Sequence, residues 1–549
     1  MSRARRLRVL GSLLLAVTPW IAGLSAASPA VAQTAREKAI VTIREARLAA
    51  TEGRSARSLP IGIFDSGTGG LAVLEEMLRL DQFDNTTHAP KPGGDGRPDF
   101  EGEQFVFMGD QANMPYGNYP ACGKRSCLVD LALNDAVFLL GREYFPNTGG
   151  RTRSRDKLPA KSIIIACNTA TAYARPEIEK LIGEAGVEAK VVGIIDGGAL
   201  GIVESLAGPG EATVGVLATR GTCESGAYPS AILALARQRG ITNLHVVQQG
   251  SFGLAGAIDG VRDFIDPSVS STETRPDYRG PSLTNAQDRI EAGLLARYQF
   301  DFSGRRMLWE GEPARPAALQ INSVENYIAY ETVSLAEQLR RNPPRRPLTA
   351  VVLGCTHFPY FTAVFARQFR RLRDYQENGQ FVYRSLLAED IRLVDPAVFA
   401  ARQLYQALAA SHELNDDAGP ARLDAAPGAP ASAGFGRPEF IQSSVVLGRA
   451  KPAEAGAPGA VPECAPAGWS QFFVTVPNPQ LPAACLDPSG GFTFDYKYGR
   501  TAELGATDFL TVPLTTGHFS KAISQRLQRQ LPDVWTLLES FSAEKKTAP

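Results

Sequence analysis

The chain has 549 residues, in which 57 lysines and arginines balance 57 aspartates and glutamates. A net charge of zero gives no reason to expect a nucleic acid or an anionic membrane as a partner. The length allows a large buried core, and about two to four domains are usual for a chain of this size.

The first 32 residues have the composition of an export signal. Arginines at positions 3, 5, 6 and 8 precede the apolar run VLGSLLLAV, and Ala30-Val31-Ala32 has the small-x-small form of a signal-peptidase site. We therefore expect residues 1–32 to be cleaved and the mature protein to be periplasmic or secreted, without membrane contact. An uncleaved anchor is the alternative, although Thr18-Pro19 interrupts a span of barely sufficient length.

Seven cysteines are an odd number for a compartment that forms disulfides. Short loops could be closed by a bridge between Cys122 and Cys127 and by another between Cys464 and Cys485. An exported protein either buries its remaining thiols or uses them. The remaining cysteines are Cys167, Cys223 and Cys355.

From residue 60 the sequence repeats one pattern, in which a short apolar run is followed by small or polar residues and then by helical periodicity. Unbroken apolar strands that alternate with helices predict an α/β fold with parallel sheets covered on both faces. Ligands bind such sheets at the carboxyl ends of the strands, where the polar clusters occur. The segments include IGIFDSGTGG, SIIIACNTATA, TVGVLATRGT and LTAVVLGCTHFPY.

Other stretches lack this pattern. Residues 84–103, 146–160 and about 266–318 are rich in Gly, Pro, Arg and Asp, which predicts surface insertions. Residues 413–468 turn to Ala, Pro and Gly, which predicts a flexible linker around one short strand, FIQSSVVLG. Residues 469–549 again contain an ordered strand pattern and an amphipathic helix pattern.

Two strand ends match each other, IIIACNTA around Cys167 and VVLGCTHF around Cys355. Two matched thiols suit inversion at a carbon that bears hydrogen, because one base removes the proton from one face and a second group returns it from the other. A helix start expected after each strand would favour the thiolate. The pairs Asn168-Thr169 and Thr356-His357 supply donors for a carboxylate.

Five ordered segments resemble the signature series of glutamate racemases in the aspartate/glutamate racemase superfamily. They are IGIFDSGTGGLAVLEEM, GDQANMPYG, ACNTATA, GVLATRGTCESGAY and LGCTHFPYF, and the resemblance covers roughly residues 58–408. It implies two Rossmann- or flavodoxin-like α/β lobes with parallel sheets, an active site between them, and no cofactor or metal. The first lobe would span 58–196, completed by about 386–408, and the second would span 197–385.

The resemblance also implies roles for individual residues. Cys167 and Cys355 would transfer protons, and Asp65 and His357 would tune the two thiols. Substrate would be bound by Asp65, Ser66, Tyr116, Gly117, Asn168, Thr169, Thr356 and His357. The segment QQGSFGLAGAID departs from the family pattern and puts Asp259 where a Glu is usual, while Cys223 is expected to be a buried spectator.

We therefore expect an exported, cofactor-independent racemase that interconverts L- and D-glutamate. Family members usually act in the cytoplasm, where D-glutamate feeds cell-wall precursor synthesis, and the resemblance allows a homodimer. The alternatives are a relative acting on aspartate, a hydantoin or maleate, and a periplasmic binding protein without turnover. A disulfide between Cys167 and Cys355 would abolish the chemistry. Metal binding by Cys355 and His357 is disfavoured, because their spacing completes no tetrahedral set.

Overall fold

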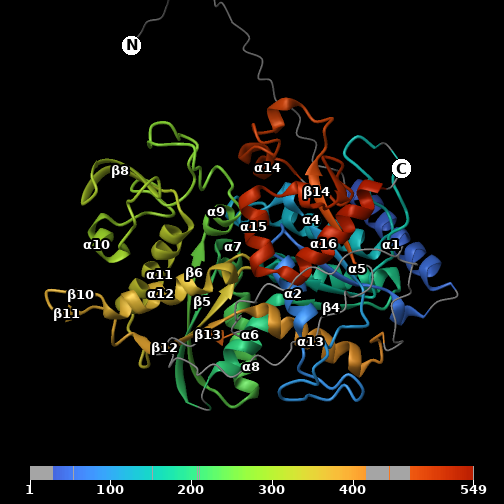
Figure 1. The fold of residues 1–549 in the computed structure, drawn as a ribbon, viewed down its shortest axis with the longest axis horizontal. Helices are drawn as coiled ribbons and strands as arrows, with labels where there is room; N and C mark the ends of the chain where they lie inside the picture. The colour runs from blue at the N-terminus through green and yellow to red at the C-terminus, as the bar shows by residue number, and fades with distance from the viewer. Residues whose placement is uncertain are drawn as a thin grey trace, which may run out of the picture.

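The computed structural model describes residues 29–52, 55–150, 152–206, 208, 210–415, 444–445, 470–501 and 503–547. These residues form two α/β lobes, each built around its own sheet (Figure 1). The expected export signal and the expected linker lie largely outside the described residues. None of the helices within the described ranges is both long and apolar enough to cross a bilayer.

The first lobe contains a six-stranded sheet in the order β15-β14-β2-β1-β3-β4. The four strands from the N-terminal half of the chain, β1 to β4, are parallel to one another. Three of them, β1, β2 and β3, are completely buried, which explains their unbroken apolar runs. Alternate residues enter separate cores, with Ile63 on one face and Phe64 on the other. The strands are β1 (Ile61–Asp65), β2 (Phe105–Gly109), β3 (Ser162–Ile165) and β4 (Lys190–Gly193).

Helices cover both faces of this sheet. On one face α1 (Pro29–Thr51), α4 (Arg125–Leu140) and α5 (Asn168–Ala185) pack against one another. On the other face α2 (Leu71–Arg79) packs against α13 (Pro396–Ala410). The sheet is therefore a buried layer, as the sequence predicts.

The second lobe contains a five-stranded sheet in the order β13-β12-β9-β5-β6. All its strands are parallel except β13, a fragment of the predicted strand FIQSSVVLG. The strands are β5 (Glu211–Thr219), β6 (Asn243–Ser251), β9 (Leu348–Gly354), β12 (Leu387–Val394) and β13 (Ser444–Val445). Helices α6 (Ile194–Ser205), α8 (Ala227–Gln238), α11 (Val324–Arg341) and α12 (Thr362–Asp374) pack around it.

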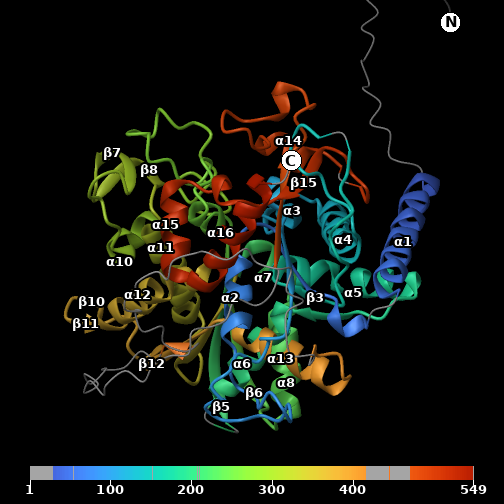
Figure 2. The ribbon, with the colours of Figure 1, turned by 45° about the vertical axis from the view of Figure 1, so that its right-hand side comes forward.

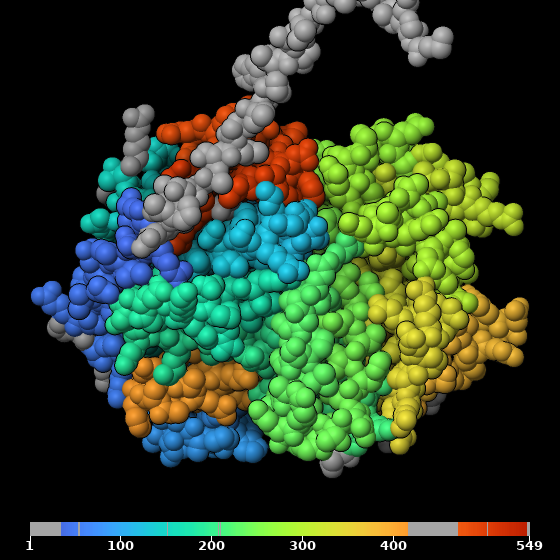
Figure 3. All heavy atoms as spheres, turned by 180° about the vertical axis from the view of Figure 1, so that it is seen from behind, coloured from blue at the N-terminus to red at the C-terminus, as the bar shows by residue number. Residues whose placement is uncertain are grey.

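The segment 386–408 differs from its predicted place in the first lobe. Strand β12 pairs with β9 and so belongs to the second sheet. Helix α13 packs against α6 and also against α2, so it lies between the two lobes. Seen from behind, the green residues at about 200 to 250 lie directly against the blue-green part of the first lobe (Figure 3).

The insertion at 266–318 forms an ordered structure on the second lobe. It contains α10 (Leu295–Tyr298), β7 (Met307–Glu312) and the start of β8 (Arg315–Ile321), and the two strands form an antiparallel hairpin. Its apolar residues join the core of that lobe. The insertion therefore adds to the outer side of the second lobe (Figure 1).

Residues 470–547, called the C-terminal extension below, complete the first sheet. Strand β14 (Gln471–Pro477) pairs in parallel with β2, and β15 (Phe509–Pro513) forms the antiparallel edge. The sequence predicts a strand here but not its partner. Figure 2 shows the extension, in orange to red, between the β7–β8 hairpin of the second lobe and α4 of the first lobe. Its helices are α14 (Phe494–Gly499), α15 (Lys521–Gln530) and α16 (Pro532–Thr547).

Candidate active site

A small cavity lies where the carboxyl ends of β1, β3, β5 and β9 meet. Its volume is about 20 Å³, which is room for a single water molecule. All ten residues that the sequence predicts for the site line this cavity. They are Asp65, Ser66, Tyr116, Gly117, Cys167, Asn168, Thr169, Cys355, Thr356 and His357.

Cys167 caps the N-terminus of α5, as predicted, and its Sγ accepts a hydrogen bond from the Ala170 N–H at 3.5 Å. Burial raises the pKa of the Cys167 thiol, and the nearby Asp65 carboxylate raises it further. The helix terminus does favour the thiolate, as predicted, since the bond from the Ala170 N–H lowers the pKa of Cys167, but burial outweighs it. Cys167 keeps its proton and is suited to act as an acid.

Asp65, the last residue of β1, joins the two lobes. Its Oδ2 accepts hydrogen bonds from the Gly70 N–H at 2.7 Å and from the Thr356 hydroxyl at 3.1 Å. Its Oδ1 is buried, and no described residue bonds it. Burial raises the pKa of Asp65, although the charge of His357 opposes this rise.

Cys355 has different surroundings from Cys167. The 3₁₀ helix η4 (Phe358–Phe361) follows it and α12 begins at Thr362, so helical structure does follow the strand, but Cys355 itself caps no helix. Instead, Nδ1 of His357 lies 3.7 Å from the Cys355 Sγ. On the other side of the ring, Nε2 of His357 lies 3.1 Å from Oδ2 of Asp259.

The Asp259–His357 pair is charged. Burial would lower the pKa of His357, but the Asp259 carboxylate and the Cys355 sulfur outweigh burial and hold this pKa well above its usual value. Burial would likewise raise the pKa of Asp259, but His357 and Arg526 hold it below its usual value. An imidazolium therefore lies beside Cys355, whereas a carboxyl group lies beside Cys167.

The cavity also contains an unused hydrogen-bond donor. Oδ1 of Asn168 accepts a hydrogen bond from the Tyr228 hydroxyl at 2.7 Å, while its Nδ2 is buried without a partner among the described residues. A buried donor without a partner is costly unless a ligand satisfies it. Asn168 is thus suited to bind an anionic group.

The Tyr116 hydroxyl is already engaged elsewhere, although the sequence predicts it for substrate binding. It donates to Oδ2 of Asp110 at 2.5 Å and lies 2.8 Å from Oδ2 of Asp135. A hydroxyl has one proton to donate, so a further proton must be shared within this cluster of carboxyls. Burial, together with the neighbouring carboxyl, raises the pKa of Asp135 well above its usual value.

Three further residues line the cavity without a role predicted from the sequence: Pro115, Thr219 and Ala255. Thr219 ends β5, so its place at a strand end is a signal that could have identified it. Its hydroxyl lies 2.9 Å from that of Thr169, across the two lobes. Pro115 and Ala255 carry no chemical signal in the sequence.

The other cysteines among the described residues, Cys122, Cys127, Cys223 and Cys485, lie outside the cavity lining. Cys122 is a free thiol, so the bridge to Cys127 is not formed. Cys485 is also free, and Cys464 lies outside the described residues. Cys223, which the sequence predicts to be buried, is partly exposed.

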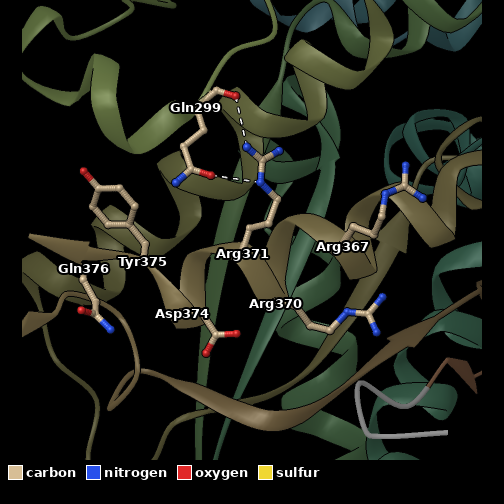
Figure 4. A pocket seen from close by; sticks show the side chains of 7 residues that line it. All are labelled: Gln299, Arg367, Arg370, Arg371, Asp374, Tyr375 and Gln376. Carbon is tan, nitrogen blue, oxygen red and sulfur yellow. Dashed lines mark hydrogen bonds between the residues drawn. The ribbon is translucent and has the colours of Figure 1, made fainter.

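A larger and more open hollow of about 740 Å³ lies on the outer side of the second lobe, beside α12. Its arginines point in different directions, and Arg371 donates to Oε1 of Gln299 at 3.0 Å (Figure 4). It contains neither a thiol nor an imidazole. The lining residues are Gln299, Arg367, Arg370, Arg371, Asp374, Tyr375 and Gln376.

No protein-family profile matches the sequence. The glutamate racemase of Latilactobacillus sakei is 32% identical over 189 residues, which are 34% of this chain and 52% of that protein. The glutamate racemase of Streptococcus agalactiae is 30% identical over 223 residues, which are 40% of this chain and 67% of that protein. The chain thus spans about half the length of the first curated relatives that it matches.

Solved structures of glutamate racemases also align with the chain. An isoform from Bacillus anthracis has a TM-score of 0.37 and 17% identity, covering 65% of this chain and 84% of that one. The structure from Francisella tularensis in complex with D-glutamate has a TM-score of 0.35 and 18% identity, covering 65% and 84%.

Proposed function

The chain belongs to the glutamate racemase family, and from this premise we propose that it interconverts L- and D-glutamate by proton transfer between Cys167 and Cys355, without a cofactor. One observation carries the proposal: the two thiols come from different lobes, line one cavity and have opposite electrostatic surroundings. Burial and Asp65 favour the protonated thiol at Cys167. At Cys355, Nδ1 of the His357 imidazolium lies 3.7 Å from Sγ.

In the proposed reaction, the Cys355 thiolate removes the Cα proton of one enantiomer. The S–H bond of Cys167 breaks as a new Cα–H bond forms on the opposite face. Cys355 then carries a proton and Cys167 is the thiolate, so one proton has been gained and one given. The reverse reaction starts from this state, and exchange of both protons with water restores the first state.

Removal of the Cα proton leaves negative charge that spreads onto the substrate carboxylate. Donors held in place before the reaction stabilise such charge most effectively. Nδ2 of Asn168 is a buried donor of this kind, because the Tyr228 hydroxyl holds the other end of the amide. We assign the substrate α-carboxylate to this donor.

Glutamate is too large for a cavity that holds one water molecule. Substrate entry therefore requires the lobes to separate. Many enzymes open and close their active sites by such domain movements. Separation would break the bond from Thr356 to Asp65 and the bond from Tyr228 to Asn168. Both bonds end on residues of the proposed site, so opening and substrate binding are coupled.

Proton NMR of L-glutamate in deuterium oxide tests the proposal. The purified protein should remove the Cα–H signal and produce D-glutamate. Cys167→Ser and Cys355→Ser should each abolish racemisation, whereas Cys223→Ser, outside the cavity, should retain it. If glutamate raises the thermal stability of the wild-type protein but no hydrogen is exchanged, the protein is a binding protein. If hydrogen is exchanged with aspartate alone, glutamate is not the substrate.

We also propose that the protein is exported. The support is the arginine-rich and apolar start of the sequence, which precedes Ala30-Val31-Ala32. Cleavage after Ala32 would keep Ala39 and Ile43, the buried residues of α1 that join the core of the first lobe. Sequencing of the mature N-terminus should begin at Gln33, and an intact N-terminus would contradict export with cleavage.

A further inference from the structure

Helix α15 of the C-terminal extension contacts the residues behind Cys355. Nη1 of Arg526 donates to the Ile258 carbonyl at 2.9 Å, and Nη2 lies 3.9 Å from Oδ1 of Asp259. The Arg526 guanidinium also lies over the Tyr360 ring, 5.3 Å from its centre. In the same helix, Nε2 of Gln530 donates to the Tyr360 carbonyl at 2.9 Å. The Arg526 side chain is only 17% exposed, so it is a packed part of the structure.

These contacts add Arg526 to the row of interacting side chains that runs through Asp259 and His357 to the Cys355 sulfur. Arg526 lies beside one oxygen of Asp259, and the other oxygen lies beside Nε2 of His357. Nδ1 of the same ring faces Cys355. We propose that Arg526 is a positioning residue for Cys355, which holds the Asp259 carboxylate and through it the orientation of His357. The inference rests on the proposed racemase function.

The arrangement has a physical reason. A buried carboxylate is costly without a cation or several donors to compensate it. Arg526 supplies the cation and is also anchored to the backbone of Ile258, the residue next to Asp259. Ile258 ends α9 (Leu254–Ile258), a helix that also contributes Ala255 to the cavity. The Arg526 guanidinium therefore compensates the charge of the Asp259 carboxylate and also fixes the backbone next to Asp259.

The other end of the extension holds the opposite wall of the cavity. The Lys497 Nζ donates to the Met114 carbonyl at 2.6 Å, and the Tyr498 hydroxyl donates to the Pro115 carbonyl at 3.2 Å. Pro115 itself lines the cavity. The extension thus contacts the walls of the cavity in both lobes. This supports a role in positioning the site as a whole.

The charges around the pair determine what removal of Arg526 does. His357 faces Asp259, Cys355 and Asp65, while Asp259 faces His357 and Arg526. Loss of a fixed positive charge makes this coupled group take up its next proton at higher pH. An opposite charge within about 4 to 6 Å usually shifts a pKa by one unit or more, so we expect the pH dependence of exchange to move up by about one unit.

The test compares the pH dependence of Cα-deuterium exchange of L-glutamate in matched variants. Arg526→Gln should move the profile up by about one pH unit and lower exchange at pH 7 on the order of tenfold. Arg526→Lys keeps the charge and should keep the wild-type profile. Arg529→Gln, an exposed position on the same helix, makes the same charge change and should behave as wild type.

If Arg526→Gln lacks a cooperative thermal transition, Arg526→Met replaces it, because its stem can still pack on Tyr360. An Arg526 variant that exchanges with the wild-type profile would overturn the inference and leave the racemase proposal intact. An Arg526→Lys profile shifted as far as that of Arg526→Gln would also overturn it. If the wild-type protein itself exchanges no hydrogen, both proposals fail.

Discussion

The hydroxyl of Tyr228 donates to Oδ1 of Asn168 at 2.7 Å, from the second lobe to the first. This bond determines which end of the amide remains for a ligand. Because Oδ1 is taken, the buried Nδ2 is left as a donor that no described residue satisfies. The contact therefore joins the lobes and orients the proposed carboxylate site at the same time.

Tyr228→Phe should weaken substrate binding, because the Asn168 amide loses the bond that orients it. We expect KM to rise about five- to tenfold and the free energy of unfolding to fall by about 1 kcal/mol. Tyr173→Phe is a matched control, since its hydroxyl also spans the lobes, to the Gly221 carbonyl at 3.1 Å, but outside the cavity lining. Steady-state kinetics should show a higher KM for the Tyr228 variant alone. Equal KM values for the two variants would contradict the assignment of the substrate carboxylate to Asn168.

Asp259→Asn should lower kcat on the order of 100-fold, because the imidazolium of His357 loses the charge that holds it protonated beside Cys355. Asp259→Glu retains the charge and should keep more of the rate. Production of D-glutamate from saturating L-glutamate measures both variants. An Asn variant as fast as wild type would show that the Asp259–His357 pair has no part in proton transfer.

Gly69→Ala should disturb the site directly. A Cβ there would lie 2.6 Å from the Thr356 Oγ1 and 2.7 Å from the His357 Cε1, so one of these side chains must move. Misplacement of a catalytic group by about 1 Å can cost on the order of 100-fold in rate, and we expect a loss of this size.

Gly183→Ala is the control for this change. A Cβ on Gly183, in α5, meets nothing within 4 Å, so the variant should gain about 0.5 to 1 kcal/mol in stability and keep full activity. Racemisation assays and urea denaturation of both variants separate the two effects. A Gly69 variant that retains full activity would mean that the Thr356–His357 turn is free to adjust.

Thr475→Val should destabilise the first lobe. The Thr475 hydroxyl donates to Oδ1 of Asp110 at 2.6 Å and accepts the Ala112 N–H at 3.0 Å, both in the buried interior. Loss of these bonds leaves the buried Ala112 N–H unsatisfied, while Oδ1 of Asp110 keeps one donor, the Asn113 amide at 2.7 Å. We therefore expect about 1 to 3 kcal/mol less stability by urea denaturation. Thr511→Val, directly opposite on β15, should cost much less. Equal losses would argue against a specific role for the bond to Asp110.

Glu331→Gln should remove a pH dependence of stability. Burial raises the pKa of Glu331 to about 8, and its Oε2 accepts a hydrogen bond from Gln249 at 2.8 Å. The folded protein therefore holds this proton more tightly than the unfolded chain, so its stabilising effect is complete below about pH 4.5 and is lost as the pH rises towards 8.

The Gln variant does not titrate at this position. Relative to wild type, its free energy of unfolding should increase between pH 5 and pH 8.5 by on the order of 3 kcal/mol. Urea denaturation at the two pH values measures the change. Parallel pH dependences of the two proteins would contradict the prediction.

The sequence predicts which residues meet at the cavity, because these residues lie at strand ends. Asp65, Cys167 and Cys355 each follow an unbroken apolar run, and parallel strands bring their carboxyl ends together. The protonation preference of Cys167 could not be predicted, because burial depends on packing by both lobes. The partners of β12 and β14 could not be predicted either, because apolar periodicity specifies a strand but not its neighbour.

Thr475 of strand β14 accepts a hydrogen bond from Ala112, which lies 363 residues earlier in the chain. During translation, β2 therefore emerges long before the strand that will cover it. Until that strand has been synthesised, the nascent first sheet has an exposed edge of the kind that pairs with other chains and aggregates. Protection of this edge therefore has to wait until residues 471–477 have been synthesised.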